Sequence, residues 1–116
     1  MDKAFYGAIS LKTLKLEGAK KIGDYAFYNA PILLNVDLGI VEEIGDYAFM
    51  RCAGIKNLVL PNTLKSIGRY AFVGCSSITS LMINDNIEYI DSFAFASNNN
   101  ISFYIENGVD TNKYNQ

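Results

Sequence analysis

The sequence predicts an α/β solenoid of about five units, each 22–23 residues long. The dipeptide Ala-Phe recurs five times along the 116 residues. Its phenylalanines are Phe5, Phe27, Phe49, Phe72 and Phe95, which gives intervals of 22, 22, 23 and 23 residues. Each interval also carries the same apolar positions at fixed offsets. A fixed period of this length indicates stacked coils, each of which buries its apolar face against its neighbours.

A short strand is predicted in each unit, shortly after the Ala-Phe pair. Two apolar positions flank one variable position there, and alternation with a period of two is typical of a half-buried strand. The apolar pairs are Leu14 and Leu16, Val36 and Leu38, Leu58 and Leu60, Leu81 and Ile83, and Phe103 and Ile105. Stacking these strands in register predicts one parallel ladder of five strands.

The other half of each unit predicts a second extended segment and a helical turn. The extended segments end at Ile22, Ile44, Ile67 and Ile90. Gly with Asp or Ser then precedes an aromatic-Ala-Phe triplet, which is a helix-start signal. We therefore expect one turn of α- or 3₁₀-helix in each unit, with its phenylalanine in the core.

Composition argues against several classes of function. The net charge is −2 and the ten basic residues alternate with acids, so no nucleic-acid surface is expected. No apolar run approaches the ~20 residues that cross a bilayer, so no membrane insertion is expected in this segment. Histidine is absent, which excludes Ser-His and Cys-His pairs, and no Gly-rich phosphate loop is present. We expect a protein that is not an enzyme and binds no cofactor.

Residues 1–116 are predicted to form a single domain, because the length suits one core. Met1-Asp2-Lys3 leads directly into the first Ala-Phe pair, so the N-terminal unit is predicted to be partial. No signal-peptide pattern occurs in this stretch. We therefore expect a fragment of a longer secreted chain, with a cytosolic protein as the alternative.

The unit LVLPNTLKSIGRYAFVGCSSI, residues 58–78, resembles the BspA-like class of leucine-rich repeats. That class combines an Ile/Leu strand, Pro, a linker, Ile-Gly, an aromatic-Ala-Phe turn and a Cys. The resemblance covers about residues 4–109, with departures at Asp91, Ala30 and Asn98. It implies a right-handed solenoid with the strand ladder on the concave face, and residues 103–116 resemble the family's C-terminal closing segment. It also implies a surface setting, because such domains occur on host-associated bacteria and parasitic protists, where several are adhesins.

The outward strand positions form three columns across the predicted sheet. They are Thr13, Asn35, Asn57, Ser80 and Ser102 in the first column; Lys15, Asp37, Val59, Met82 and Tyr104 in the middle column; and Glu17, Gly39, Pro61, Asn84 and Glu106 in the third. Val59, Met82 and Tyr104 are expected to lie ~4.8 Å apart in successive strands, and Met and aromatic residues are enriched in protein interfaces. The candidate partner-binding residues are Val59, Met82, Tyr104, Asp37, Lys15, Asn35, Asn57 and Ser80. An ordinary solvated sheet face, with Lys15 and Asp37 as a cross-strand pair, is the alternative.

These observations favour a non-enzymatic protein-binding module of a cell-surface or secreted adhesion protein. Its partner would be another protein or a host matrix component. One alternative is a structural spacer that displays another domain. Another is a carbohydrate-binding surface on the aromatic residues Tyr25, Tyr47, Tyr70 and Phe93. We expect mostly monomer, with weak end-to-end association at the 13–17 strand edge.

Two further residue sets have a structural and a chemical interpretation. Cys52 and Cys75 occupy the same position in adjacent units, where stacking would bring their Cα atoms within disulfide range, but two buried thiols are favoured. Asp24, Asp46 and Asp91 recur once per unit. Calcium needs six to eight converging oxygens, so no metal site is predicted from one carboxylate per coil.

Overall fold

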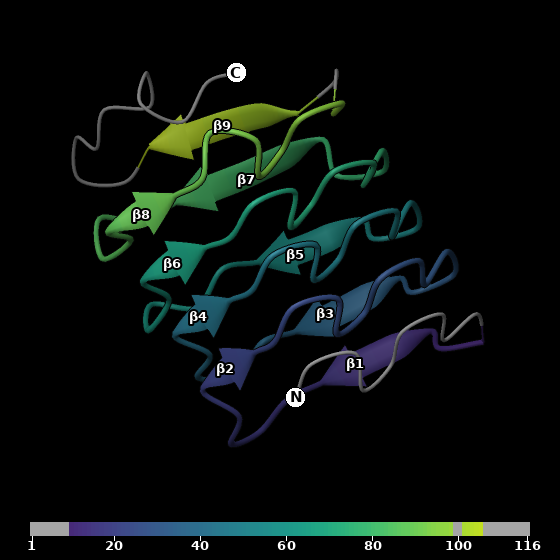
Figure 1. The fold of residues 1–116 in the computed structure, drawn as a ribbon, viewed down its shortest axis with the longest axis horizontal. Helices are drawn as coiled ribbons and strands as arrows, with labels where there is room; N and C mark the ends of the chain where they lie inside the picture. The colour runs from purple at the N-terminus through teal and green to yellow at the C-terminus, as the bar shows by residue number, and fades with distance from the viewer. Residues whose placement is uncertain (1–9, 99–100, 106–116) are drawn as a thin grey trace.

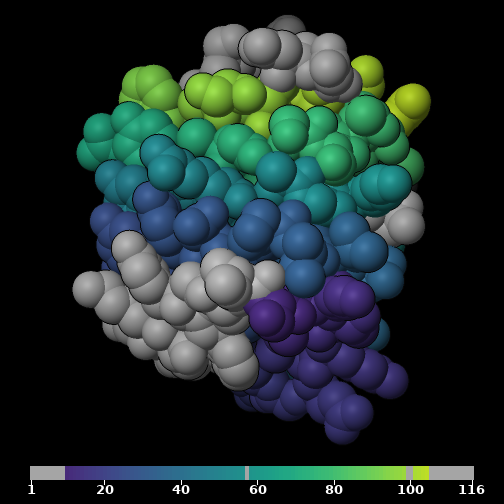
Figure 2. Space-filling model, turned by 90° about the vertical axis from the view of Figure 1, so that its right-hand side faces the viewer, coloured from purple at the N-terminus to yellow at the C-terminus, as the bar shows by residue number. Residues whose placement is uncertain are grey.

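Figure 1 shows the computed structural model of the chain, which describes residues 10–98 and 101–105. The coils stack in sequence order, and the space-filling view in Figure 2 shows them as successive bands from purple to yellow. Each coil contributes one strand to a first wall and one shorter strand to a second wall. All described strand pairs are parallel. The solenoid predicted from the repeat is therefore present.

The first wall contains the five predicted strands. They are β1 (Thr13–Lys15), β3 (Asn35–Asp37), β5 (Asn57–Val59), β7 (Ser80–Ile83) and β9 (Ser102–Ile105). The predicted alternation is confirmed, since β1 and β3 each carry one buried residue between two exposed ones. The register is also as expected, with Leu14 opposite Val36 and Val36 opposite Leu58.

The prediction of one continuous ladder of five strands is corrected. The described strands form a three-stranded group, β1-β3-β5, and a two-stranded group, β7-β9. The strands start at 13, 35, 57, 80 and 102, so the interval from β5 to β7 is 23 residues, whereas the other intervals in this wall are 22. The longer coil thus coincides with the break in the hydrogen-bonded ladder.

The second wall is one four-stranded ladder, as the second apolar site predicted. Its strands are β2 (Lys21–Ile22), β4 (Glu43–Ile44), β6 (Ser66–Ile67) and β8 (Tyr89–Ile90), in that order. The isoleucines stand opposite one another in the register and all are buried. Their neighbours Lys21, Glu43 and Tyr89 point outward and are exposed. The predicted extended segment is confirmed.

The predicted helical turn is not present, and the α/β class is corrected for this reason. The described residues contain no helix. Tyr25, Tyr47 and Tyr70 have φ values of 62°, 61° and 57°, whereas a helical residue needs φ near −60°. Alternate backbone N–H groups of this segment bond to the next coil, as in the 2.8 Å bond from Phe27 N to Ala48 O. Those between them bond within their own turn, as Ala26 N does to Gly23 O at 3.2 Å. The aromatic-Ala-Phe triplets therefore form a third, hydrogen-bonded wall of tight turns.

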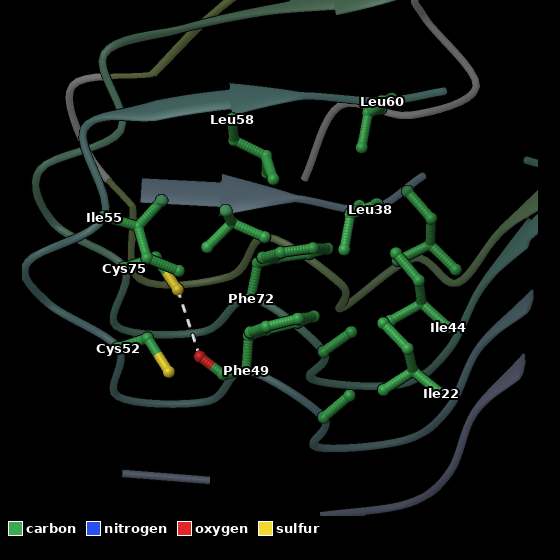
Figure 3. Packing of buried hydrophobic residues seen from close by; sticks show 14 of the residues in the cluster. Ile22, Leu38, Ile44, Phe49, Cys52, Ile55, Leu58, Leu60, Phe72 and Cys75 are labelled. Atoms are coloured by element: carbon green, nitrogen blue, oxygen red, sulfur yellow. Dashed lines mark hydrogen bonds between the residues drawn. The ribbon is translucent and has the colours of Figure 1, made fainter. Parts of the chain in front are cut away.

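The core is a column of stacked phenylalanines between the walls, part of which is drawn in Figure 3. Phe27, Phe49 and Phe72 have no exposed surface. Successive ring centroids lie 5.2 Å and 5.3 Å apart, and Phe95 continues the column 5.2 Å beyond Phe72. The predicted internal phenylalanine column is confirmed. The alanine before each ring is also buried, which allows the coils to approach closely.

Candidate functional site

The outer face of the first wall, which we call the ladder face, carries a stripe of exposed apolar side chains. Val59 on β5 is 75% exposed, Met82 on β7 is 50% exposed and Tyr104 on β9 is 55% exposed. Met82 and Tyr104 are direct partners in the register. Val59 and Met82 lie on either side of the ladder break and line one depression there. The structure thus brings the three predicted apolar residues onto one surface, with the break between the first two.

The N-terminal half of the ladder face is charged. Lys15 and Asp37 are partners in the register of β1 and β3, as the sequence predicted. The Asp37 carboxylate, however, turns toward its own chain: its Oδ1 accepts a hydrogen bond of 3.0 Å from the Gly39 N–H. Within the described ranges no ion pair joins Lys15 to Asp37. Among the residues that the structure describes, the Lys15 ammonium therefore has no carboxylate partner.

Hydrogen-bonding side chains lie beside the apolar stripe. The exposed residues of the first column are Thr13, Asn35, Ser80 and Ser102. The backbone of Asn57 pairs in register with Asn35. The four exposed residues agree with the predicted outward positions.

The third column departs from the prediction at Asn84. Its side chain is only 3% exposed, so it is not available to a partner. The Asn84 amide donates to the Pro61 carbonyl at 3.4 Å, and its Oδ1 accepts from the Asn86 N–H at 3.1 Å. Asn84 is buried because its turn needs these hydrogen bonds. Glu106, the last member of this column, lies outside the described residues.

Two depressions lie on the ladder face. The larger, which we call the Gly39 hollow, has a volume of about 580 Å³ and lies over β1, β3 and β5. The smaller, the Val59–Met82 slit, has a volume of about 180 Å³ and lies at the ladder break. Outward side chains around the hollow include Lys15, Asn35, Asp37, Val59 and Pro61. Sequence reasoning missed both depressions, although Asp37-Leu-Gly39 is a turn signal of the kind that leaves a gap in a column.

On the third wall, the aromatic rings of successive coils stack on one another. The rings of Tyr25 and Tyr47 are 4.6 Å apart at an angle of 4°, and Tyr70 and Phe93 continue the series at 5.3 Å and 5.6 Å. The Arg69 guanidinium lies 5.1 Å from the Tyr70 ring centroid. Sugars stack on open ring faces, but here neighbouring rings cover one another. The geometry favours the structural interpretation over carbohydrate binding.

The recurring aspartates are hydrogen-bond acceptors between coils. Asp24 Oδ1 accepts from the Asp46 N–H, and Asp46 Oδ1 accepts from the Arg69 N–H, both at 2.8 Å. Asp91 instead accepts from the Phe93 N–H in its own turn. Within the described part of the chain, no three acidic or thiol side chains converge in a way that suits a metal ion.

Cys52 and Cys75 are buried free thiols. Each Sγ–H donates to a carbonyl of the preceding coil, Cys52 to Phe27 O and Cys75 to Phe49 O, both at 3.1 Å; Figure 3 draws the second bond. Burial raises the pKa of Cys52 to about 11 and raises that of Cys75 further. The buried-thiol interpretation is confirmed, and both sulfurs stay in the thiol form that donates.

The thiols are therefore expected to be unreactive in the folded protein. At pH 8, a thiol-specific reagent such as dithiobis-nitrobenzoate should label neither cysteine in buffer and both in 8 M urea, because the thiolate is the reactive form. Since the folded pKa of Cys52 is raised from 9.0 to about 11, its thiol should also make stability fall as pH rises through this range. Full-rate labelling of the native protein would contradict the buried geometry.

The repeat also identifies the family. Residues 1–102 match a family model described as the BspA type leucine rich repeat region, in six copies. The chain belongs to the BspA-type leucine-rich repeat family. The resemblance seen in the sequence is thereby confirmed, with one copy more than the five Ala-Phe pairs suggest.

Solved bacterial leucine-rich repeat structures share this fold. A leucine-rich repeat protein of Treponema pallidum is 30% identical, with a TM-score of 0.84 over 87% of this chain and 48% of that one. One from Bacteroides ovatus is 29% identical, with a TM-score of 0.82 over 91% of this chain and 28% of that one. The chain thus spans about half of the first protein and less of the second. A search of curated proteins gives no match.

A third similar structure is a leucine rich cell surface protein from Faecalibacterium prausnitzii. It is 18% identical, with a TM-score of 0.51 over 90% of this chain and 41% of that one, so the likeness concerns the fold alone. Among the described residues, none belongs to a helix with the length and apolarity needed to cross a membrane.

Proposed function

We propose that this BspA-type repeat chain is a non-enzymatic module that binds a partner protein through the ladder face. The observation that carries the proposal is the exposed stripe of Val59, Met82 and Tyr104 beside a column of uncharged hydrogen-bonding side chains. Apolar and aromatic side chains surrounded by polar ones are typical of protein interfaces. The family resemblance implies that this face is the concave side of the solenoid.

The setting proposed is a cell-surface or secreted adhesion protein whose partner is a surface protein or host matrix component. Support comes from the family to which the chain belongs. The chain would act as one part of a longer protein, since it spans only part of its structural neighbours. It would be mostly monomeric, with weak end-to-end association.

The proposal predicts that truncating the stripe abolishes partner binding. The triple variant Val59→Ala, Met82→Ala, Tyr104→Ala should weaken binding by at least ~100-fold, because each interface truncation removes about 1 kcal/mol or more. The measurement is surface plasmon resonance of the immobilised chain against purified surface and matrix proteins. Circular dichroism should show that the triple variant remains folded.

A matched control distinguishes the stripe from general surface apolarity. Ile32, Ile40 and Tyr89 are 40%, 42% and 55% exposed and lie outside the stripe. Their triple alanine variant should bind as the unchanged chain does. Equal losses in both triple variants would show that the stripe is not the binding surface. If none of the purified surface and matrix proteins binds the unchanged chain, the structural spacer is favoured instead.

A further inference from the structure

The coil of β5 and β6 is joined unevenly to the coil of β7 and β8, at what we call the third junction. In the first wall, β1 pairs with β3 and β3 pairs with β5, but among the described strands no pairing joins β5 to β7. The slit of about 180 Å³ between Val59 and Met82 lies at the same place. The ladder face is therefore discontinuous at the third junction.

The third wall also has fewer bonds at this junction. At the preceding one, which we call the second junction, three backbone bonds of 2.7–2.8 Å join the turns of the two coils: Tyr47 N to Arg69 O, Phe49 N to Ala71 O and Arg51 N to Val73 O. At the third junction, the bonds found between the described turns reduce to one, from Phe72 N to Ala94 O at 2.8 Å. Two of the three backbone bonds are thus missing there.

A side-chain bond between the turns is missing as well. Asp24 and Asp46 each accept a hydrogen bond from a backbone N–H of the following coil. Arg69 stands at this position in the coil of β6 and has no carboxylate to accept one. Its guanidinium lies 5.9 Å from the ring centroid of Phe93 in the next coil. A cation–π contact between exposed side chains therefore takes the place of a hydrogen bond to the backbone.

The second wall keeps its bonds across the third junction. β6 pairs with β8 in register, and the Glu88 N–H donates to the Lys65 carbonyl at 2.8 Å. The equivalent bond at the second junction, from the Lys65 N–H to the Glu42 carbonyl, has the same length. Asparagine side chains also join the turns between the first and second walls, with bonds from Asn84 to Pro61 O and from Asn86 to Asn62 O. The two coils are thus firmly joined along this side.

The core is continuous across the third junction. The Phe72 and Phe95 rings stack with their centroids 5.2 Å apart. The Asn98 amide donates to the Phe72 carbonyl, as the Cys75 thiol does to the Phe49 carbonyl at the second junction. The third junction therefore differs from the second in the first and third walls, and not in the core or the second wall.

From this asymmetry we infer that the solenoid has a hinge at the third junction. The second wall, with its intact ladder, is the axis. The ladder face opens between β5 and β7, and the remaining third-wall bond at Phe72 breaks with it. Opening moves Val59 and Met82 apart, so the apolar stripe changes its width. The hinge does not depend on the proposed function, because a chain that binds no partner would also have it.

Native-state hydrogen exchange, followed by nuclear magnetic resonance of the ¹⁵N-labelled chain, tests the hinge. Phe49 and Phe72 are a matched pair, since both are fully buried and their N–H groups make bonds of 2.7 and 2.8 Å to the next coil. After correction for intrinsic rates, the Phe72 amide should exchange about tenfold faster or more, because fewer bonds hold the third junction closed. The Glu88 amide on the second wall should exchange as slowly as the Lys65 amide.

Two results would overturn the inference. Equal exchange of the Phe49 and Phe72 amides would mean that the third junction is as rigid as the second. Fast exchange of both the Phe72 and the Glu88 amides would mean that the coil of β7 and β8 separates as a whole instead of turning about the second wall.

A double variant restores the missing side-chain bond. It combines Arg69→Asp with Asp91→Gly. These changes give the third junction the carboxylate and the glycine that Asp46 and Gly68 provide at the second. The added carboxylate is placed to accept from the Ser92 N–H, as Asp46 accepts from the Arg69 N–H. The control combines Arg69→Ala with Asp91→Gly and adds no carboxylate.

The double variant should slow exchange of the Phe72 amide about fivefold relative to the control, because one hydrogen bond is added across the third wall. The Phe49 amide, whose bonds lie at the second junction, should exchange equally in both. Equal exchange of the Phe72 amide in the two double variants would contradict opening of the third wall at this junction.

Discussion

Replacing Phe72 with alanine is expected to lower the free energy of unfolding by about 3–5 kcal/mol, a large share of what a domain of this size has. The Phe72 ring is fully buried between Phe49 at 5.3 Å and Phe95 at 5.2 Å. The coils cannot close the resulting cavity easily, because the Phe72 N–H bonds to the Ala94 carbonyl of the next coil at 2.8 Å. Urea unfolding followed by circular dichroism measures the loss.

The matched control is Phe93→Ala, which makes the same chemical change on a ring that is 46% exposed. It should lower stability by about 1 kcal/mol, since it loses one stacking contact with Tyr70 and no internal cavity forms. Equal losses from the two variants would show that the phenylalanine column does not carry the core.

The fold could be predicted from the sequence where side chains alone decide it. The alternation around Leu14 and Val36 gives strands, and the phenylalanine period gives the internal column. The turn after each Ile-Gly could not be predicted in this way. Gly-Asp ahead of Tyr-Ala-Phe has local helix-start chemistry, but every second backbone N–H group bonds to the next coil. Tyr25 also adopts a left-handed φ that aromatic residues rarely occupy. Contacts between coils decide this segment.

The candidate site shows the same division. Period-two alternation placed Val59, Met82 and Tyr104 outward, and all three are exposed. The prediction that Asn84 is exposed was wrong, because its side-chain amide is buried and hydrogen-bonded in a turn. The Gly39 hollow could not be predicted from the sequence either, because its lining comes from three coils and depends on how they stack.

The Gly and Asp residues at the third wall are coupled between coils. A Cβ on Gly45 would lie 2.6 Å from Asp24 Oδ1, and one on Gly68 would lie 2.5 Å from Asp46 Oδ1. A carboxylate that bonds to the next coil therefore requires glycine there. Asp91 fits this rule, since it stands where glycine is expected but follows the coil that carries Arg69 in place of aspartate. The two departures from the repeat thus explain each other.

Gly68→Ala is therefore expected to lower stability by about 1–3 kcal/mol, the range for overpacking. Its Cβ would also lie 2.7 Å from the Gly45 carbonyl carbon, so the coil itself must shift. The control is Gly18→Ala, where nothing lies within 4 Å, and its change should stay within about 0.5 kcal/mol.

A double-mutant cycle tests whether the Asp46 carboxylate is the cause. Asp46→Ala alone should lose about 1 kcal/mol with its bond to the Arg69 N–H. In the double variant with Gly68→Ala the loss should be smaller than the sum of the two single losses, because the colliding carboxylate is already gone. Additive losses would mean that the backbone contact alone requires glycine, and Asp91 would then need another explanation. A smaller combined loss would make the pairing of aspartate with glycine in the next coil a rule for how these repeats stack.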